Sequence, residues 1–260
     1  MEIIIQKDAD TASLLAARVV ANVIRQKPNA VLGLATGSSP IRFYRHLIKM
    51  YVTGEVDFKN VTTFNLDEYV GLPPSHNSSY ASFMHNQFFK HVNIKEKNIN
   101  IPDGLASDIP LFCLNYEKKI RQLGGIDVQI LGIGSDGHIG FNEPTSSLAS
   151  RTRIKTLTKQ TIEDNAQFFG PNEPVPHHVI TMGIGTILDS SSCILLAFGE
   201  KKANALAKAV EGPITSMVPA SALQLHRDAK AFLDEGSASK FLRSEYYRYV
   251  YDNKPEWQKY

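Results

Sequence analysis

Short apolar runs alternate with longer stretches of helical periodicity along most of the chain, and this alternation limits the possible folds more than any other feature. Several short runs, such as 128–133 and 193–198, are almost continuously apolar. Strands of a parallel sheet have this composition because helices cover both faces of such a sheet. Strands are expected over residues 3–5, 30–35, 61–66, 99–101, 128–133, 193–198 and 229–233. Helices are expected over residues 8–26, 41–52, 80–89, 111–123 and 201–210.

Repeated strand–helix units predict an α/β fold with a doubly wound, mainly parallel sheet and helices on both faces. No internal repeat or linker-like segment divides the 260 residues. We therefore expect a single domain over residues 1–260, with a C-terminal helix and tail from about residue 237. The aromatic end, residues 246–260, is expected to pack on the body of the protein or on a neighbour.

Charge and composition restrict the possible partners and the compartment. The chain has 28 basic and 26 acidic residues and a net charge of +2, a balance that favours neither nucleic acid nor an anionic membrane as a partner. No apolar stretch approaches the ~20 residues that span a bilayer, and the N-terminus does not resemble a signal peptide, so a cytoplasmic protein is expected. Cys113 and Cys193 lie far apart and are expected to be buried thiols rather than a disulfide or a metal site.

The first candidate loop follows the strand expected over 30–35, and in sheets of this type ligands bind beyond the carboxyl ends of the strands. Backbone N–H groups and hydroxyls ahead of a helix N-terminus suit a phosphate. The residues that supply them are Thr36, Gly37, Ser38 and Ser39. Ordinary helix capping by Ser38 or Ser39 would explain the same residues.

A lysine pair follows the strand expected over 193–198. The ammonium group of Lys201 or Lys202 could neutralise a phosphate held by the first loop. The alternative is a pair of exposed helical lysines.

Two adjacent carboxylates follow the strand expected over 61–66. Asp67 and Glu68 should point in opposite directions, so only one of them can face a ligand. That carboxylate could act as a general base, whereas a solvated acidic turn is the alternative.

The glycine-rich loop 131–144 carries the strongest chemical signal. Asp136, His138, Asn142 and Glu143 lie within eight positions of one another. Carboxylates beside an imidazole hold it in one tautomer and favour its protonated form, which makes a unit for proton transfer.

The same loop contains G-I-G-S-D-G at 132–137, which matches the dinucleotide-binding pattern G-x-G-x-x-G. That motif requires a helix to begin at the loop, but here the chain continues as H-I-G-F-N-E-P. A zinc site at Asp136, His138 and Glu143 lacks a second histidine at helical spacing. We therefore predict no cofactor and no metal.

Four stretches match a known family over essentially the whole chain. They are F-N-L-D-E-Y-V-G-L at 64–72, the G-S-D-G-H-I-G-F-N-E-P run at 134–144, S-S-L-A-S-R-T-R-I-K-T-L-T at 146–158, and S-A-L-Q-L-H at 221–226. With these motifs the chain resembles the glucosamine-6-phosphate deaminase family. The resemblance implies a Rossmann-like fold of the deaminase, ribose-5-phosphate isomerase and CoA-transferase type, which 6-phosphogluconolactonases share. It also implies conversion of glucosamine 6-phosphate and water to fructose 6-phosphate and ammonia without a cofactor.

The resemblance assigns roles to individual residues. Asp67 matches the base that moves a proton from C2 to C1, and His138, oriented by Asp136 and Glu143, matches the group that opens the sugar ring. The positions that match the phosphate site are Thr36, Gly37, Ser38, Ser39 and Lys202.

Part of the family is a hexamer with an allosteric site for N-acetylglucosamine 6-phosphate between its subunits. The matching positions are Ser146, Arg153, Lys155 and Thr156. Arg151, Arg153 and Lys155 alternate along an expected strand, where they would form either an anion site or a solvated edge. By resemblance we expect a homo-oligomer, with a hexamer as the specific hypothesis.

The chain departs from the family in two segments of the phosphate site. It has T-G-S-S-P where the family usually has T-G-G-T-P, which keeps a hydroxyl. It has Gln167 where the family commonly has arginine. A neutral amide cannot replace a bidentate guanidinium, so either weaker substrate binding or compensation by another cation is expected.

Two other functions remain open at this point. A hydrolase of the 6-phosphogluconolactonase kind would use the histidine loop but has less need of a base at Asp67. A non-catalytic sugar-phosphate sensor would keep the phosphate loop but has no need of four proton-transfer groups.

Overall fold

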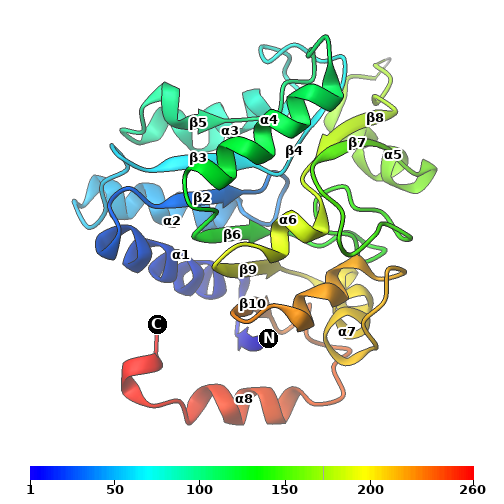
Figure 1. Cartoon of the computed structure of the whole chain (residues 1–260). Helices are drawn as coiled ribbons and strands as arrows, with labels where there is room; N and C mark the ends of the chain where they lie inside the picture. Colours follow the sequence, from blue (N-terminus) through cyan, green and yellow to red (C-terminus); the bar gives the residue numbers. More distant parts are fainter. Residues whose placement is uncertain (172) are drawn as a thin grey trace.

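The computed structural model describes residues 1–171 and 173–260 and is built around a seven-stranded parallel sheet (Figure 1). Its strands are β1 Glu2–Gln6, β2 Val31–Leu34, β3 Thr62–Asn65, β5 Ile99–Asn100, β6 Val128–Leu131, β9 Ser192–Ala197 and β10 Ala229–Asp234. They lie in the order β1-β10-β9-β6-β2-β3-β5, and every neighbouring pair is parallel. The predicted α/β fold with a doubly wound, mainly parallel sheet is confirmed.

Helices connect the strands and cover the sheet (Figure 1). The α-helices are α1 Ala9–Gln26, α2 Ile41–Val52, α3 Tyr80–Gln87, α4 Ile109–Gln122, α5 Lys159–Asn165, α6 Ile184–Leu188, α7 Ala203–Glu211 and α8 Ser244–Asp252. Short 3₁₀ turns are η1 Phe89–His91, η2 Glu96–Asn98, η3 Ala166–Phe168, η4 Glu200–Lys202, η5 Pro219–Leu225 and η6 Glu256–Gln258. Among the described helices, none combines the length and the apolar composition needed to cross a membrane.

Helix α1 shows how the sequence determines the packing. The Asp8 carboxylate accepts a hydrogen bond of 2.7 Å from the Thr11 N–H and so caps the helix start. Ala12, Ala16 and Val20, spaced four residues apart, are fully buried. Small side chains on this face allow α1 to pack closely on α2 and on strands β1 and β10.

The order of the strands reverses in the middle of the sheet. From β2 the chain proceeds outward through β3 to β5, and from β6 it proceeds the other way through β9 to β10. Strands β2 and β6 are neighbours, so the loops that follow them diverge. Such a switch point leaves a crevice at the carboxyl ends of the strands, which is where ligands of doubly wound sheets bind.

A second sheet, which the sequence did not predict as a unit, packs beyond the carboxyl end of β3. It consists of β4 Asp67–Tyr69, β8 His178–Thr181 and β7 Arg153–Thr156 in the order β4-β8-β7, and both pairs are antiparallel. The strand expected over 61–66 therefore ends at Asn65, and after Leu66 the chain enters the second sheet. The Met182 N–H donates to the Leu66 carbonyl at 2.7 Å, which fixes the junction between the two sheets.

The C-terminal segment packs on the body along the edge strand β1 (Figure 1). Its helix begins at Ser244, later than the expected boundary of about residue 237, because the chain forms turns after β10. The Tyr260 hydroxyl donates to Glu2 at 2.7 Å, and the Lys254 ammonium donates to the same carboxylate at 2.6 Å. The segment therefore covers an edge that would otherwise expose unpaired backbone groups. The assignment of residues 1–260 to one domain stays a prediction.

Candidate active site

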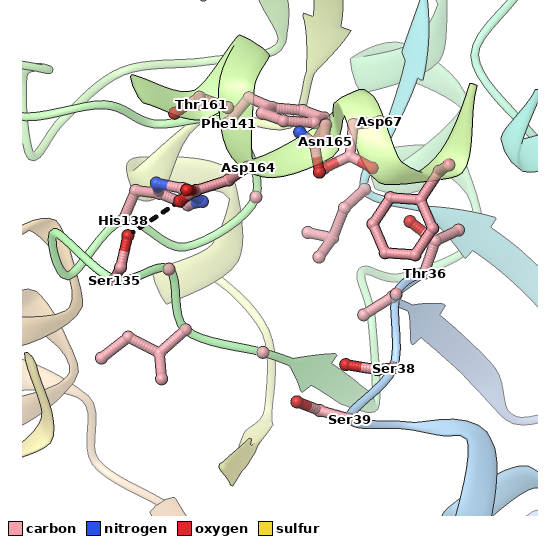
Figure 2. A pocket seen from close by; sticks show the side chains of 18 of the residues that line it. Thr36, Ser38, Ser39, Asp67, Ser135, His138, Phe141, Thr161, Asp164 and Asn165 are labelled. Carbon is pink, nitrogen blue, oxygen red and sulfur yellow. Dashed lines mark hydrogen bonds between the residues drawn. The ribbon is translucent and has the colours of Figure 1, made fainter. Parts of the chain in front are cut away.

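A cavity of about 440 Å³ lies at the switch point, beyond the carboxyl ends of β2, β3 and β6 (Figure 2). The loop after β2 borders it with residues 35–39, and the loop after β6 borders it with residues 132–135. Asp67 from β4 and Lys202 from η4 complete the border that the sequence predicts. Four segments far apart in the chain thus meet around one space large enough for a small sugar.

Asp67 faces this cavity, whereas its neighbour Glu68 faces away from it. The Glu68 carboxylate accepts hydrogen bonds from the backbone N–H groups of Tyr80 at 3.0 Å and Ala81 at 2.9 Å, at the start of α3. Opposite orientations of adjacent strand residues were expected, and the structure confirms them. Burial, together with the nearby charge of Glu68, raises the pKa of Asp67 to about 8.

The loop 132–143 does not lead into a helix, so a dinucleotide site is excluded there on geometry. Glycines give the loop its shape at two points. A Cβ atom on Gly134 would lie 2.2 Å from the His138 ring, and Gly137 has a φ of +92°, which favours glycine. The Gly134 N–H donates to the His138 carbonyl at 2.9 Å and closes the loop on itself.

The two predicted carboxylates lie on the same side of the His138 ring. Asp136 Oδ1 lies 2.7 Å from His138 Nδ1, and Glu143 Oε2 lies 3.8 Å from the same nitrogen. The His138 backbone N–H also donates to Asp136 Oδ1 at 3.0 Å. Because both carboxylates approach Nδ1, the other ring nitrogen, Nε2, is left for a ligand in the cavity.

Burial and the His138 ring have opposite effects on the pKa of Asp136. Partial burial opposes its ionisation, but the contacts with His138 outweigh that penalty and hold the pKa of Asp136 well below its usual range. Oδ1 of Asp136 lies off the direction of an Nδ1–H bond, and both His138 Nδ1 and Glu143 Oε2 lack a hydrogen-bond partner in the described part of the chain.

The ligand atoms of Asp136, His138 and Glu143 lie within 4.8 Å of one another, so their spacing alone is also compatible with a metal ion.

The predicted phosphate-binding residues all border the cavity, and Figure 2 shows Ser38 and Ser39 at one side of it. Gly37 has a φ of +93°, which turns the loop after β2. Helix α2 has Pro40 as its N-cap residue and no side-chain cap, so the alternative that Ser38 or Ser39 simply caps this helix is wrong. Their hydroxyls are therefore available to a ligand.

Lys202 lies in η4, the 3₁₀ turn that precedes α7, rather than inside the helix expected over 201–210. Burial lowers the pKa of Lys202, and the charges of Asp164 and Asp136 oppose that shift. Gln167 also borders the cavity, where its amide donates to the Asp164 carbonyl at 2.8 Å.

Several residues that border the cavity were missed from the sequence. Tyr80 at the start of α3 stacks on Phe141 with ring centroids 6.1 Å apart and an interplanar angle of 3°. Asp164 in α5 accepts a hydrogen bond of 3.0 Å from the Ser135 hydroxyl, drawn as a dashed line in Figure 2. Tyr80 lies in α3 and Asp164 in α5, and the sequences of these helices do not indicate that either helix borders the cavity.

The four residues matched to an effector site lie outside this cavity. Ser146 is buried, and its hydroxyl has no hydrogen-bond partner among the described residues. Arg153 in β7 donates to Asn142 Oδ1 at 2.9 Å. Lys155 lies two residues further along β7 on the same side as Arg153, while Thr156 is exposed. The predicted strand is confirmed for Arg153 and Lys155, whereas Arg151 precedes β7 and pairs with Asp189.

The two cysteines are buried and free, as expected.

Comparison with known proteins agrees with the fold and with the motifs. A glucosamine-6-phosphate deaminase from Cellvibrio japonicus is 53% identical over 250 residues, which cover 96% of this chain and 95% of that protein. A glucosamine-6-phosphate deaminase from Pseudarthrobacter chlorophenolicus is 50% identical over 99% of both chains.

Solved structures give the same result at two levels of similarity. A monomeric glucosamine-6-phosphate deaminase superposes with a TM-score of 0.90 at 44% identity, covering 92% of this chain and 100% of that one. The 6-phosphogluconolactonase of Trypanosoma brucei superposes with a TM-score of 0.72 at 18% identity, over 92% of this chain and 97% of that one, and shows the shared fold alone. The model of the family "Glucosamine-6-phosphate isomerases/6-phosphogluconolactonase" matches residues 6–232. The resemblance expected from the motifs is thereby confirmed, and the chain belongs to this family of sugar-phosphate enzymes.

Proposed function

We propose that this protein is a glucosamine-6-phosphate deaminase, which converts glucosamine 6-phosphate and water to fructose 6-phosphate and ammonia. The observation that carries the proposal is the convergence of Asp67 and His138 on one cavity whose border also contains the loop 36–39. A base, an acid and an anion site around one space are what an aldose–ketose isomerisation of a phosphosugar requires.

His138 opens the sugar ring in the first step. Its Nε2 takes the proton of the anomeric hydroxyl and returns a proton to the ring oxygen, so that the C1–O5 bond breaks and an aldehyde forms. Asp136 and Glu143 hold the ring from the Nδ1 side and stabilise the imidazolium that forms between the two transfers.

Asp67 moves the proton that changes the aldose into the ketose. Its carboxylate takes the proton from C2, which gives an enolamine, and delivers a proton to C1, which leaves an imine at C2. Water adds to that carbon, and ammonia departs with the electron pair of the C–N bond. Every step is a proton transfer or an addition and elimination of water and amine, so no redox partner is needed.

The phosphate is held at the side of the cavity opposite to this chemistry. The phosphate oxygens accept hydrogen bonds from the backbone N–H of Gly37 and from the hydroxyls of Ser38 and Ser39. Lys202 supplies a positive charge. Thr36 begins the same loop and borders the cavity with them.

Ammonia release from glucosamine 6-phosphate tests the function directly. Asp67→Asn should lower kcat by about 10²–10⁴-fold, since a positioned base contributes that much to a proton transfer. Asp252→Asn, at the end of α8 and exposed, is the matched control and should keep full activity. Hydrolysis of 6-phosphogluconolactone without ammonia release would instead identify a lactonase, and binding of the sugar phosphate without turnover would identify a sensor.

A second, regulatory part of the proposal concerns the basic row on β7. Arg153 is half-buried and has no carboxylate within ion-pair distance among the described residues, and the buried Ser146 hydroxyl is unpartnered. Together with Lys155 and Thr156 these groups suit the phosphate of N-acetylglucosamine 6-phosphate in a cytoplasmic homo-oligomer, with a hexamer as the specific hypothesis. Sigmoidal kinetics that become hyperbolic when this ligand is added would support the proposal. Hyperbolic kinetics that the ligand leaves unchanged, or a monomer in solution, would contradict it.

A further inference from the structure

The side chain of Thr181 is fully buried between Asp67 and the loop that carries His138. Thr181 is the last residue of β8, and it pairs directly with Asp67 of β4 on one side. Directly opposed residues of an antiparallel pair project to the same face, with their Cβ atoms about 4.5–5.5 Å apart. The side chain of Thr181 is therefore the cross-strand neighbour of the Asp67 carboxylate.

The same hydroxyl also holds the loop that carries His138. The Phe141 N–H donates to Thr181 Oγ1 at 3.0 Å, and this hydrogen bond is buried. One residue further along the chain, the Met182 carbonyl accepts from the Asn142 side-chain amide at 2.8 Å. The loop between His138 and Glu143 is thus attached to the end of β8 by two hydrogen bonds.

Gly140 makes this close approach possible. A Cβ atom at this position would lie 2.9 Å from Thr181 Oγ1 and 3.5 Å from Asp67 Oδ2. The positive φ of +55° at Gly140 brings the backbone of the loop against the face of the β4–β8 pair from which Asp67 and Thr181 project. The strand end, the base and the loop therefore meet at a single point.

We propose that Thr181 is a positioning residue, whose hydroxyl sets the placement of the His138 loop relative to the Asp67 carboxylate. Thr181 does not border the cavity and so does not touch the substrate. Its effect on catalysis arises because the acid and the base must reach neighbouring atoms of one sugar, and a displacement of about 1 Å can cost about 10²-fold in rate. The proposal rests on the function proposed above.

The test compares Thr181→Val with two controls. Valine has the shape of threonine but leaves the buried Phe141 N–H without an acceptor, so the loop must move to find one. Thr181→Ser keeps the hydroxyl. Thr63→Val makes the same change at a fully buried threonine of β3 whose hydroxyl has no partner in the described structure.

We expect Thr181→Val to lower kcat by about 10–100-fold with a change in KM below about 3-fold, because the phosphate site is untouched. Thr181→Ser and Thr63→Val should stay within about 3-fold of the wild-type kcat. A displaced loop should also admit water to Asp67 and so lower its pKa, which burial raises. The rise of kcat/KM with pH should therefore move to lower pH in Thr181→Val alone. A wild-type kcat and an unmoved pH profile in folded Thr181→Val would overturn the proposal.

Hydrogen exchange of the loop 138–143 separates this inference from the proposed function, because it needs no substrate. Amide protection in this loop should fall in Thr181→Val and stay unchanged in Thr63→Val. If Thr181→Val fails to fold, Gly140→Ala perturbs the same point with the hydroxyl in place and should lower kcat more than KM. Unchanged loop protection in Thr181→Val, or an unchanged kcat in Gly140→Ala, would count against the positioning role whatever the substrate of the enzyme.

Discussion

Asp67 and Glu68 are adjacent in β4 but have opposite surroundings. Asp67 borders the cavity, and Glu68 lies against the first turn of α3, where two backbone N–H groups donate to it in addition to that of Tyr69. The two carboxylates are close enough for the charge of Glu68 to raise the pKa of Asp67, in addition to the larger effect of burial. One acidic pair thus supplies both the candidate base and a group that tunes it.

This pair predicts how activity depends on pH. Asp67 must be ionised to act as a base, and its pKa of about 8 means that it is mostly protonated in the free enzyme at neutral pH. We expect kcat/KM to rise with pH up to about 8 and then to level off. A pH–rate profile measures this directly, and a kcat/KM that is already constant from pH 5 upward would show that the titrating base is not Asp67.

Replacing Glu68 should move that rise. In Glu68→Gln the repulsion by a second negative charge is lost, so the pKa of Asp67 should fall and the rise in kcat/KM should move to lower pH. The loss of charge at the start of α3 should also destabilise the fold, because a carboxylate there accepts hydrogen bonds from Tyr80 and Ala81. Glu245→Gln on the exposed side of α8 is the control, with no change expected in either property.

Asp67→Asn should make the protein more stable while it inactivates it. The folded pKa of about 8 lies above the unfolded value of about 3.9, so the unfolded chain binds fewer protons between these values and stability falls as pH rises through this window. The asparagine variant lacks that penalty and should be more stable by about 5 kcal/mol at pH 8 and above, because the shift is about four pKa units at about 1.36 kcal/mol each. Urea denaturation at pH 8 and near pH 4 tests the sign, because the advantage should disappear at the acidic end. An equal effect at both pH values would show that packing, rather than ionisation, is responsible.

Gln167→Arg should strengthen substrate binding. Gln167 borders the cavity, and a guanidinium there could donate two charge-assisted hydrogen bonds to a phosphate. An interaction of about 1.5 kcal/mol corresponds to a KM about 10-fold lower, with kcat little changed. Gln122→Arg on the exposed end of α4 adds the same charge away from the cavity border and serves as the control. A KM that stays the same in Gln167→Arg would argue against a phosphate role for this position.

Chelation distinguishes proton transfer from metal catalysis at Asp136, His138 and Glu143. We expect dialysis against EDTA to leave ammonia release unchanged, because His138 and Asp67 can carry every proton that the reaction moves. The spacing of the three ligand atoms, all within 4.8 Å, makes the opposite result worth testing. Activity that is lost with EDTA and restored by Zn²⁺ would assign the cluster to a metal.

The parallel sheet could be predicted from sequence because its strands are buried on both faces and are apolar throughout, as in 193–198. The antiparallel sheet could not. Strands β4 and β8 are three and four residues long and have no continuous apolar run that marks them as strands. The alternation in β7 did predict a strand, but nothing in the sequence shows that β7 pairs with β8, or β8 with β4.

The residues that border the cavity divide in the same way. Asp67, His138 and the loop 36–39 lie in segments that follow β3, β6 and β2, where the topology of the fold places ligands, and the motifs identify them. Tyr80 and Asp164 border the cavity, and Thr181 lies behind it, only through tertiary packing and cross-strand pairing. No periodicity in the chain encodes these contacts.

The candidate base lies in the antiparallel sheet, whereas the candidate phosphate loop follows a strand of the parallel sheet, and only Leu66 separates β3 from β4 where the sheets join. This short junction limits how far the two groups can move apart. Under the function proposed above, we expect a five-carbon amino-sugar phosphate bound at the loop 36–39 to hold its C2 hydrogen short of Asp67, so that the joined sheets select substrates by chain length.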